Sequence, residues 1–276
     1  MESRVISDWN DAYANGAHID GAEAYPARWD AAAATFRSEM LAAGRARLDL
    51  AYGPGTRECF DLFMPEGTAR GLAVFVHGGY WRAFDKSSWS HLARGALSRG
   101  CAVAIPSYTL CPDATIAQIS TQIGRAITQA AALVSGPIFL AGHSAGGHLV
   151  SRMACAQSPL GHGAAVRLAH ILSISGLHDL RPLLKTDMNR DLRLDWMQAS
   201  EESPALLMPR EGARLTAWVG AEERPEFIRQ SSLIANIWTG CGAQTALVRD
   251  AGRHHFDVID GLADGQSKMV RTWIAT

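Results

Sequence analysis

The segment Gly142–Gly146 reads Gly-His-Ser-Ala-Gly, a G-x-S-x-G pattern, and it constrains the fold of this chain more than any other stretch. An apolar run, 137–141, comes directly before it, and a segment able to start a helix, 148–154, follows. A turn this tight from a strand into a helix crowds the backbone around the serine, and glycine on both sides removes Cβ atoms that would clash. The pattern predicts that Ser144 stands above a sheet edge as a nucleophile, with a purely structural glycine turn as the alternative.

Apolar runs and helical stripes alternate along the rest of the chain. The run 72–76 is typical of a strand buried on both faces, and apolar residues recur on one face of a helix from Ile116 to Val134. The expected strands are 47–52, 58–63, 72–76, 101–105, 138–141, 170–174, 215–219 and 245–248, and the expected helices are 23–43, 88–99, 116–134, the segment after Ser144, 226–238 and 268–274. The first two strands flank a Gly-Pro-Gly turn and should pair at a sheet edge. The repeated units predict an α/β protein with a mostly parallel sheet between helices.

The chain is expected to form one domain, 1–276, since no internal repeat, low-complexity tract or long linker divides it. With 276 residues, 47% of them hydrophobic, it can bury a large core. Residues 1–45 are expected to be an N-terminal helical extension. The alternation breaks around three prolines within 176–212, which predicts a small cap-like insertion over the sheet edge.

Charge and composition narrow the classes of partner. A net charge of −1 and the lack of a long basic run give no electrostatic case for nucleic acid or an acidic membrane. No stretch approaches the length of a membrane span, and five cysteines without a Cys-x-x-Cys pair fit free thiols in a reducing compartment. We therefore expect a cytoplasmic protein that binds a small-molecule substrate, with a homodimer left open.

A nucleophilic serine needs a base, an acid that orients the base, and N–H donors for the developing oxyanion. In open α/β sheets such groups gather at the carboxyl ends of strands. The strand 72–76 is followed by His77–Trp81, which reads His-Gly-Gly-Tyr-Trp. The backbone N–H groups of Gly78, Gly79 and Ala145 are expected to form an oxyanion hole.

Four more side chains near these glycines have expected roles. His77 is expected to brace the loop, because one base is usually enough. Tyr80 and Trp81 are expected in the substrate pocket, with core packing as the alternative. His143, next to the serine, is a third expected pocket residue.

The base should follow the last strand, where His254 and His255 stand side by side. Adjacent histidines cannot both face Ser144, so we expect His255 as the base and His254 as a solvated neighbour or a hydrogen-bonding residue of the loop. Neither metal-ligand spacing nor a G-x-G-x-x-G after a strand is found, so no metal and no cofactor are expected.

The acid should follow the strand 215–219, where Glu222 and Glu223 are neighbours that spacing does not separate. Asp179 is a third candidate, although an aspartate before Leu180 is typical of a helix N-cap.

Six segments also carry the motifs of a known family. They are His77–Trp81, Tyr108–Pro112, Gly142–Leu149, Ser175–Leu180, Pro225–Phe227 and His254–Val258. These segments resemble the α/β-hydrolase-type arylformamidase (kynurenine formamidase) group, which is similar to hormone-sensitive-lipase-like esterases. The N-terminal part resembles the group loosely, with Tyr13-Ala14-Asn15 near the family's usual Tyr-Asn pair.

The resemblance implies an α/β-hydrolase fold with an eight-stranded, mostly parallel sheet. Carried over residue by residue, it makes Ser144 the nucleophile, His255 the base and Glu223 the acid, where the family usually has aspartate. The implied reaction is hydrolysis of an aryl formamide such as N-formylkynurenine, or of a small acyl ester, through an acyl-enzyme. The alternatives are a short-chain carboxylesterase or thioesterase with the same machinery, and a small-molecule-binding protein of this fold that is not an enzyme.

Overall fold

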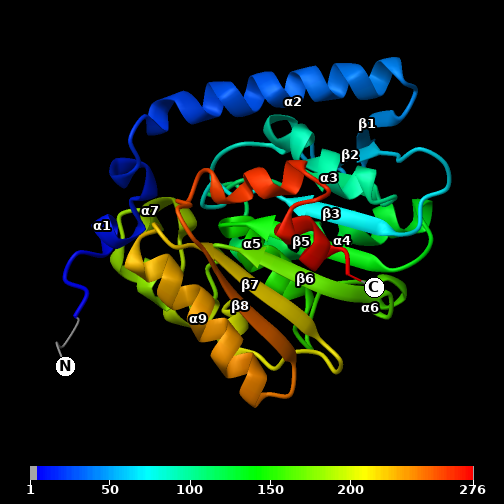
Figure 1. The fold of residues 1–276 in the computed structure, drawn as a ribbon. Coiled ribbons are helices and arrows are strands. Elements are labelled where there is room, and N and C mark those ends of the chain that lie inside the picture. Colours follow the sequence, from blue (N-terminus) through cyan, green and yellow to red (C-terminus); the bar gives the residue numbers. More distant parts are fainter. Residues whose placement is uncertain (1–4, 276) are drawn as a thin grey trace.

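Within residues 5–275, which the computed structural model describes, eight strands form one sheet in the order β1-β2-β4-β3-β5-β6-β7-β8 (Figure 1). The strands are β1 (Ala46–Ala51), β2 (Cys59–Phe63), β3 (Leu72–Val76), β4 (Ala102–Pro106), β5 (Ile138–His143), β6 (Leu168–Ile174), β7 (Arg214–Gly220) and β8 (Gln244–Asp250). Strand β2 pairs antiparallel with β1 and β4, and the other pairings are parallel. The expected eight-stranded, mostly parallel α/β sheet is confirmed.

Helices cover both faces of this sheet. The α-helices are α1 (Trp9–Tyr13), α2 (Tyr25–Ala42), α3 (Ala93–Ser98), α4 (Ile116–Leu133), α5 (Ala145–Met153), α6 (His162–Ala165), α7 (Asn189–Leu192), α8 (Trp196–Glu201), α9 (Pro225–Gly240) and α10 (Lys268–Trp273). The 3-10 helices are η1 (Asn15–His18), η2 (Ala22–Ala24), η3 (Lys86–Leu92), η4 (Arg181–Lys185), η5 (Pro204–Leu206) and η6 (Val258–Ala263). The helix expected at 88–99 forms instead as the 3-10 helix η3 followed by the short α-helix α3.

Two hydrophobic cores lie on opposite faces of the sheet because successive strand residues point to opposite sides. Val74 of β3 belongs to the core under α4, α5 and α9, whereas its neighbour Phe75 belongs to the core under α2, α3 and α10. Strands β3, β4 and β5 are buried along their whole length. Their continuous apolar runs therefore follow from cover on both faces.

The parallel register brings the ends of neighbouring strands together. His143 at the end of β5 is paired with Ile174 at the end of β6, and Ile174 is paired with Trp218 of β7. The residues that follow these strands, Ser144 and Ser175 among them, thus meet at one edge of the sheet.

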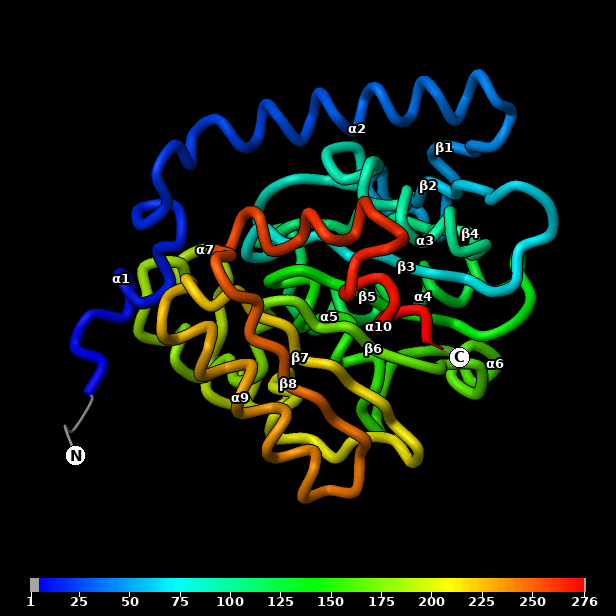
Figure 2. Tube along the Cα trace, in the orientation of Figure 1, coloured from blue at the N-terminus to red at the C-terminus, as the bar shows by residue number. Residues whose placement is uncertain are grey.

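The N-terminal segment runs along the outside of the molecule (Figure 2). Helix α2 packs on η3 through Trp29, Phe36 and other residues of one buried stripe. Before it, α1 contacts α9 and η4, so the first residues reach the carboxyl edge of the sheet. No helix within the described part of the chain is long and apolar enough to cross a membrane.

Candidate active site

Ser144 occupies the turn between β5 and α5, in a backbone conformation that non-glycine residues rarely adopt (φ 55°, ψ −118°). Its N–H donates to the Ile174 carbonyl at 2.8 Å. A Cβ on Gly142 would lie 2.1 Å from the Gly146 carbonyl oxygen, and one on Gly146 would lie 1.9 Å from that of Val76. Both glycines of the pattern are therefore required by close backbone approach.

Gly146→Ala is expected to destabilise the protein by about 2–4 kcal/mol, because the added methyl group must displace the backbone of β3. Urea unfolding measures the difference in the free energy of unfolding. Gly163→Ala is the matched control, since a Cβ there meets nothing within 4 Å, and it should change stability by no more than about 1 kcal/mol. Equal stability of the two variants would contradict the packing argument.

His255 and Glu223 form a buried pair beside this turn. His255 follows β8, and its Nδ1 lies 2.6 Å from Oε2 of Glu223, which stands between β7 and α9. The other carboxylate oxygen, Oε1, accepts the Gly220 N–H at 2.8 Å and the Ser175 hydroxyl at 2.5 Å. Both oxygens of Glu223 are thus engaged, and one of them holds the imidazole.

The three carboxylates left open by spacing occupy different surroundings. Glu222 is exposed to solvent. Asp179 forms a two-point ion pair with Arg181, at 2.8 and 2.9 Å, and accepts its backbone N–H. Within the described chain, Glu223 is the one of the three that contacts His255.

His254, the neighbour of His255, makes hydrogen bonds within its own loop and to helix α2. Its Nδ1 accepts the N–H of Phe256 at 3.1 Å, and its Nε2 lies 3.1 Å from the Tyr25 hydroxyl. The adjacent histidines therefore face different partners.

The glycine loop after β3 lies against the serine turn. A Cβ on Gly78 would be 3.0 Å from the Cβ of Ser144, and Gly79 has φ 102°. The N–H groups of Gly78, Gly79 and Ala145 donate to no other group within residues 5–275. They are free to bind an oxyanion beside Ser144.

His77 braces this loop from behind. Its ring stacks on Tyr108 with centroids 4.4 Å apart, and its Nδ1–H donates to the Gly78 carbonyl at 2.7 Å. Burial lowers the pKa of His77 to about 4, so the ring is neutral near pH 7.

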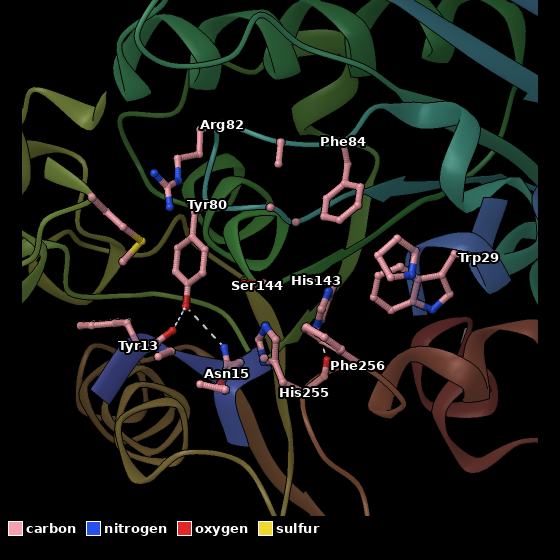
Figure 3. Close-up of a pocket in the computed structure, with 18 of the residues that line it drawn as sticks. Tyr13, Asn15, Trp29, Tyr80, Arg82, Phe84, His143, Ser144, His255 and Phe256 are labelled. Atoms are coloured by element: carbon pink, nitrogen blue, oxygen red, sulfur yellow. Dashed lines mark hydrogen bonds between the residues drawn. The ribbon is translucent and has the colours of Figure 1, made fainter. Parts of the chain in front are cut away.

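Ser144, His255, Gly78 and Gly79 line one cavity of about 500 Å³, and Figure 3 shows Ser144, His143 and His255 together within it. Nε2 of His143 donates to the His255 carbonyl at 2.9 Å. Burial lowers the pKa of His143 well below its ordinary value, and charge on His255 lowers it further. His143 is therefore a neutral wall residue of the cavity.

Of the two expected aromatic pocket residues, Tyr80 lines the cavity and Trp81 does not. Trp81 is fully buried and packs edge-to-face on His148, with centroids 5.2 Å apart. Both residues have positive φ (50° and 57°), and this backbone path turns Tyr80 toward the cavity and Trp81 into the core behind the loop. The expectation that Trp81 lines the pocket is wrong.

The alpha/beta hydrolase family model matches residues 73–273 of this chain. The chain belongs to the alpha/beta hydrolase family. A kynurenine formamidase of Drosophila melanogaster is 30% identical over 241 residues, which cover 80% of this chain and 78% of that protein. A kynurenine formamidase of Danio rerio is 26% identical and covers 79% and 77%. The resemblance seen in the motifs is thereby confirmed.

Solved structures agree with the assignment to this hydrolase family. A Silicibacter protein provisionally described as a thioesterase is 51% identical, with a TM-score of 0.93 over 97% of this chain and 99% of its own. Esterase B of Lactobacillus rhamnosis has a TM-score of 0.69 at 15% identity, covering 92% and 93% of the two chains, and shares the fold. The family match and the kynurenine formamidase relatives show that the chain is a hydrolase, which excludes the non-enzyme alternative.

One wall of the hydrolase cavity comes from the N-terminal segment, ahead of the range that the family model matches. The Tyr80 hydroxyl donates to the Tyr13 carbonyl at 2.5 Å, and the Asn15 amide donates to the Tyr80 oxygen at 3.4 Å (Figure 3). The Tyr13 hydroxyl in turn donates to Glu226 of α9 at 2.8 Å. Only the loose Tyr-Asn likeness pointed to this segment, since short helices without an apolar stripe give no periodic signal.

The sequence patterns also did not predict the aromatic residues at one end of the hydrolase cavity. Four aromatic residues from three separate segments line it: Trp29, Phe84, Trp89 and Phe256. The rings of Trp29 and Trp89 have centroids 4.7 Å apart, and that of Phe256 lies 5.4 Å from Trp29. These contacts join residues far apart in the chain, so spacing could not show them.

Proposed function

We propose that this hydrolase cleaves aryl formamides or small acyl esters through a Ser144–His255–Glu223 triad and an acyl-enzyme. The observation that carries the proposal is the buried His255–Glu223 pair, whose imidazole lines one cavity together with the strained Ser144 and with Gly78 and Gly79, two of the residues whose N–H groups bind no acceptor within residues 5–275. This arrangement has every group that nucleophilic acyl transfer requires.

In this mechanism the Ser144 hydroxyl attacks the substrate carbonyl carbon while Nε2 of His255 takes its proton. Glu223 holds Nδ1–H of the ring at 2.6 Å and stabilises the imidazolium that forms. The N–H groups of the glycine loop and Ala145 stabilise the tetrahedral oxyanion. Its collapse breaks the bond to the leaving group, which receives the proton from His255. Water, activated by the same imidazole, then releases the acid and restores Ser144.

His255 is the general base in this scheme because the other histidines near the serine are otherwise engaged. His143 and His77 each donate one ring N–H to a backbone carbonyl, and burial lowers the pKa of both. A histidine whose pKa is lowered by burial binds a proton weakly, so it is a poor acceptor for the serine proton at neutral pH.

The shape and lining of the cavity support a small aryl substrate. Its volume of about 500 Å³ is in the range of small-molecule sites. The aromatic end offers ring faces and edges against which an aryl group stacks favourably. The relatives named kynurenine formamidase support a formamide as the scissile group.

Thioester hydrolysis is the second candidate. It is favoured by the 51% identical Silicibacter protein, which is provisionally described as a thioesterase. The same triad and oxyanion donors would serve this reaction, because its acyl-enzyme step is the same.

Steady-state kinetics on four substrates test the proposal: formanilide, phenyl acetate, S-phenyl thioacetate and ethyl acetate. We expect formanilide and phenyl acetate to be turned over with higher kcat/KM than ethyl acetate, and a fluorophosphonate to label the enzyme and stop turnover. A preference for the thioester over both would select the second candidate. No turnover of any substrate and no labelling would contradict the serine-hydrolase proposal.

A further inference from the structure

Ser175 is a buried residue at the edge of the site with no role in the scheme above. It follows β6 directly, one strand away from Ser144, and its side chain is fully buried. Its hydroxyl donates to Oε1 of Glu223 at 2.5 Å. This is the carboxylate oxygen that does not contact His255.

The backbone of Ser175 is held in an unfavourable conformation by the sheet. Its φ is 52°, in the left-handed region that serine rarely adopts. Its N–H donates to the carbonyl of Trp218 on the neighbouring strand at 2.7 Å. Such strain persists where the surrounding structure fixes it, and it is concentrated at functional sites. Here the strained backbone places the Ser175 hydroxyl next to the Glu223 carboxylate.

The Glu223 carboxylate needs the Ser175 hydrogen bond because glutamate has one more rotatable side-chain bond than aspartate. A carboxylate at the end of a longer chain must be held at both oxygens to keep its partner imidazole in one orientation. The Gly220 N–H supplies one donor to Oε1, and the Ser175 hydroxyl supplies a second from a different strand. Together they fix Oε1, so that Oε2 faces His255.

We propose that Ser175 is a positioning residue for the Glu223 carboxylate, and through it for the His255 imidazole. The inference rests on the proposed triad. It assigns to the serine of the Ser175–Leu180 motif a task in catalysis, although this serine touches neither the reacting atoms nor the cavity.

Two variants remove the hydroxyl, Ser175→Ala and Ser175→Gly. Glycine has no steric penalty at φ 52°, so it keeps the test valid if the alanine variant folds poorly. With phenyl acetate, we expect kcat to fall about 10- to 100-fold, the range for loss of one hydrogen bond to a charged group. KM should stay within about threefold, because the lost contact orients the base and does not bind substrate.

Ser173→Ala is the matched control. Ser173 is a fully buried serine two residues earlier in the chain, and its hydroxyl bonds to the Gly147 carbonyl at 3.1 Å and to His178 at 3.2 Å, away from the acid. It should keep kcat within about threefold of the wild type while losing a comparable buried hydrogen bond.

A double-mutant cycle separates positioning from general structure. In a Glu223→Ala background there is no carboxylate to hold, so adding Ser175→Ala should lower kcat no further. The proposal is overturned if Ser175→Ala and Ser175→Gly behave like Ser173→Ala, or if the full loss persists in the Glu223→Ala background. A wrong triad assignment would give a different result. Turnover would then survive Ser144→Ala, regardless of the effect of the Ser175 variants.

Discussion

Ser144→Ala is expected to lower kcat/KM for phenyl acetate and formanilide by about 10⁴-fold or more. The acyl-enzyme cannot form without the hydroxyl, and what remains is binding and oxyanion stabilisation of a direct attack by water. Steady-state kinetics and loss of fluorophosphonate labelling measure the effect. Alanine accepts the same backbone conformation about as well as serine does, so the fold should be kept.

Ser151→Ala is the control for this variant. Ser151 is a buried serine two turns along α5, and its hydroxyl is bound to the Gly147 carbonyl at 2.8 Å, outside the cavity. It should retain turnover within about threefold and remain fully labelled. Undiminished turnover in Ser144→Ala would rule out the serine as nucleophile.

Glu223→Gln is expected to lower kcat by about 10³- to 10⁴-fold although the side chain keeps its shape. The Gly220 N–H and the Ser175 hydroxyl both donate to the same side of this carboxylate, so the glutamine oxygen should turn toward them. Its NH₂ group would then face Nδ1 of His255. A ring that accepts at Nδ1 carries its proton on Nε2 and cannot take the proton of Ser144.

Two conservative variants show whether the acid is assigned correctly. Glu222→Gln changes an exposed side chain, and Asp179→Asn weakens an ion pair with Arg181 that makes no contact with His255. Both should keep kcat within about threefold, with Asp179→Asn lowering thermal stability instead. A larger loss of kcat in either one than in Glu223→Gln would move the acid to that residue.

Much of the fold follows from local sequence patterns. All eight strands were expected within two residues of their observed ends, because apolar runs buried on both faces and alternating edge strands leave distinct signals. The Gly-x-Ser-x-Gly turn could also be predicted from the sequence. Its glycines are required by contacts within a few residues of the serine and with the adjacent strand. Helix α1 and the 3-10 helices of the N-terminal segment gave no such signal.

Only part of the active site could be predicted from the sequence. The sequence left Glu222, Glu223 and Asp179 open, and the family resemblance selected Glu223, the one that contacts His255 in the structure. Trp81 was expected in the pocket, but positive φ angles in its loop turn it into the core. The walls built from Tyr13 and Trp29 were missed, because their approach to Ser144 depends on how a separate segment packs.

The sequence by itself determined the strand order along the chain, the tight serine turn and the family, because each depends on residues close together in the chain or on whole motifs. The tertiary structure alone decided which aromatic residues surround the serine and what fixes the acid in place, and it brings Glu223, which the family resemblance had selected, against the imidazole. Ser175 and Glu223, for example, are 48 residues apart in the chain, and the register of β5, β6 and β7 brings the segments that carry them within hydrogen-bond distance.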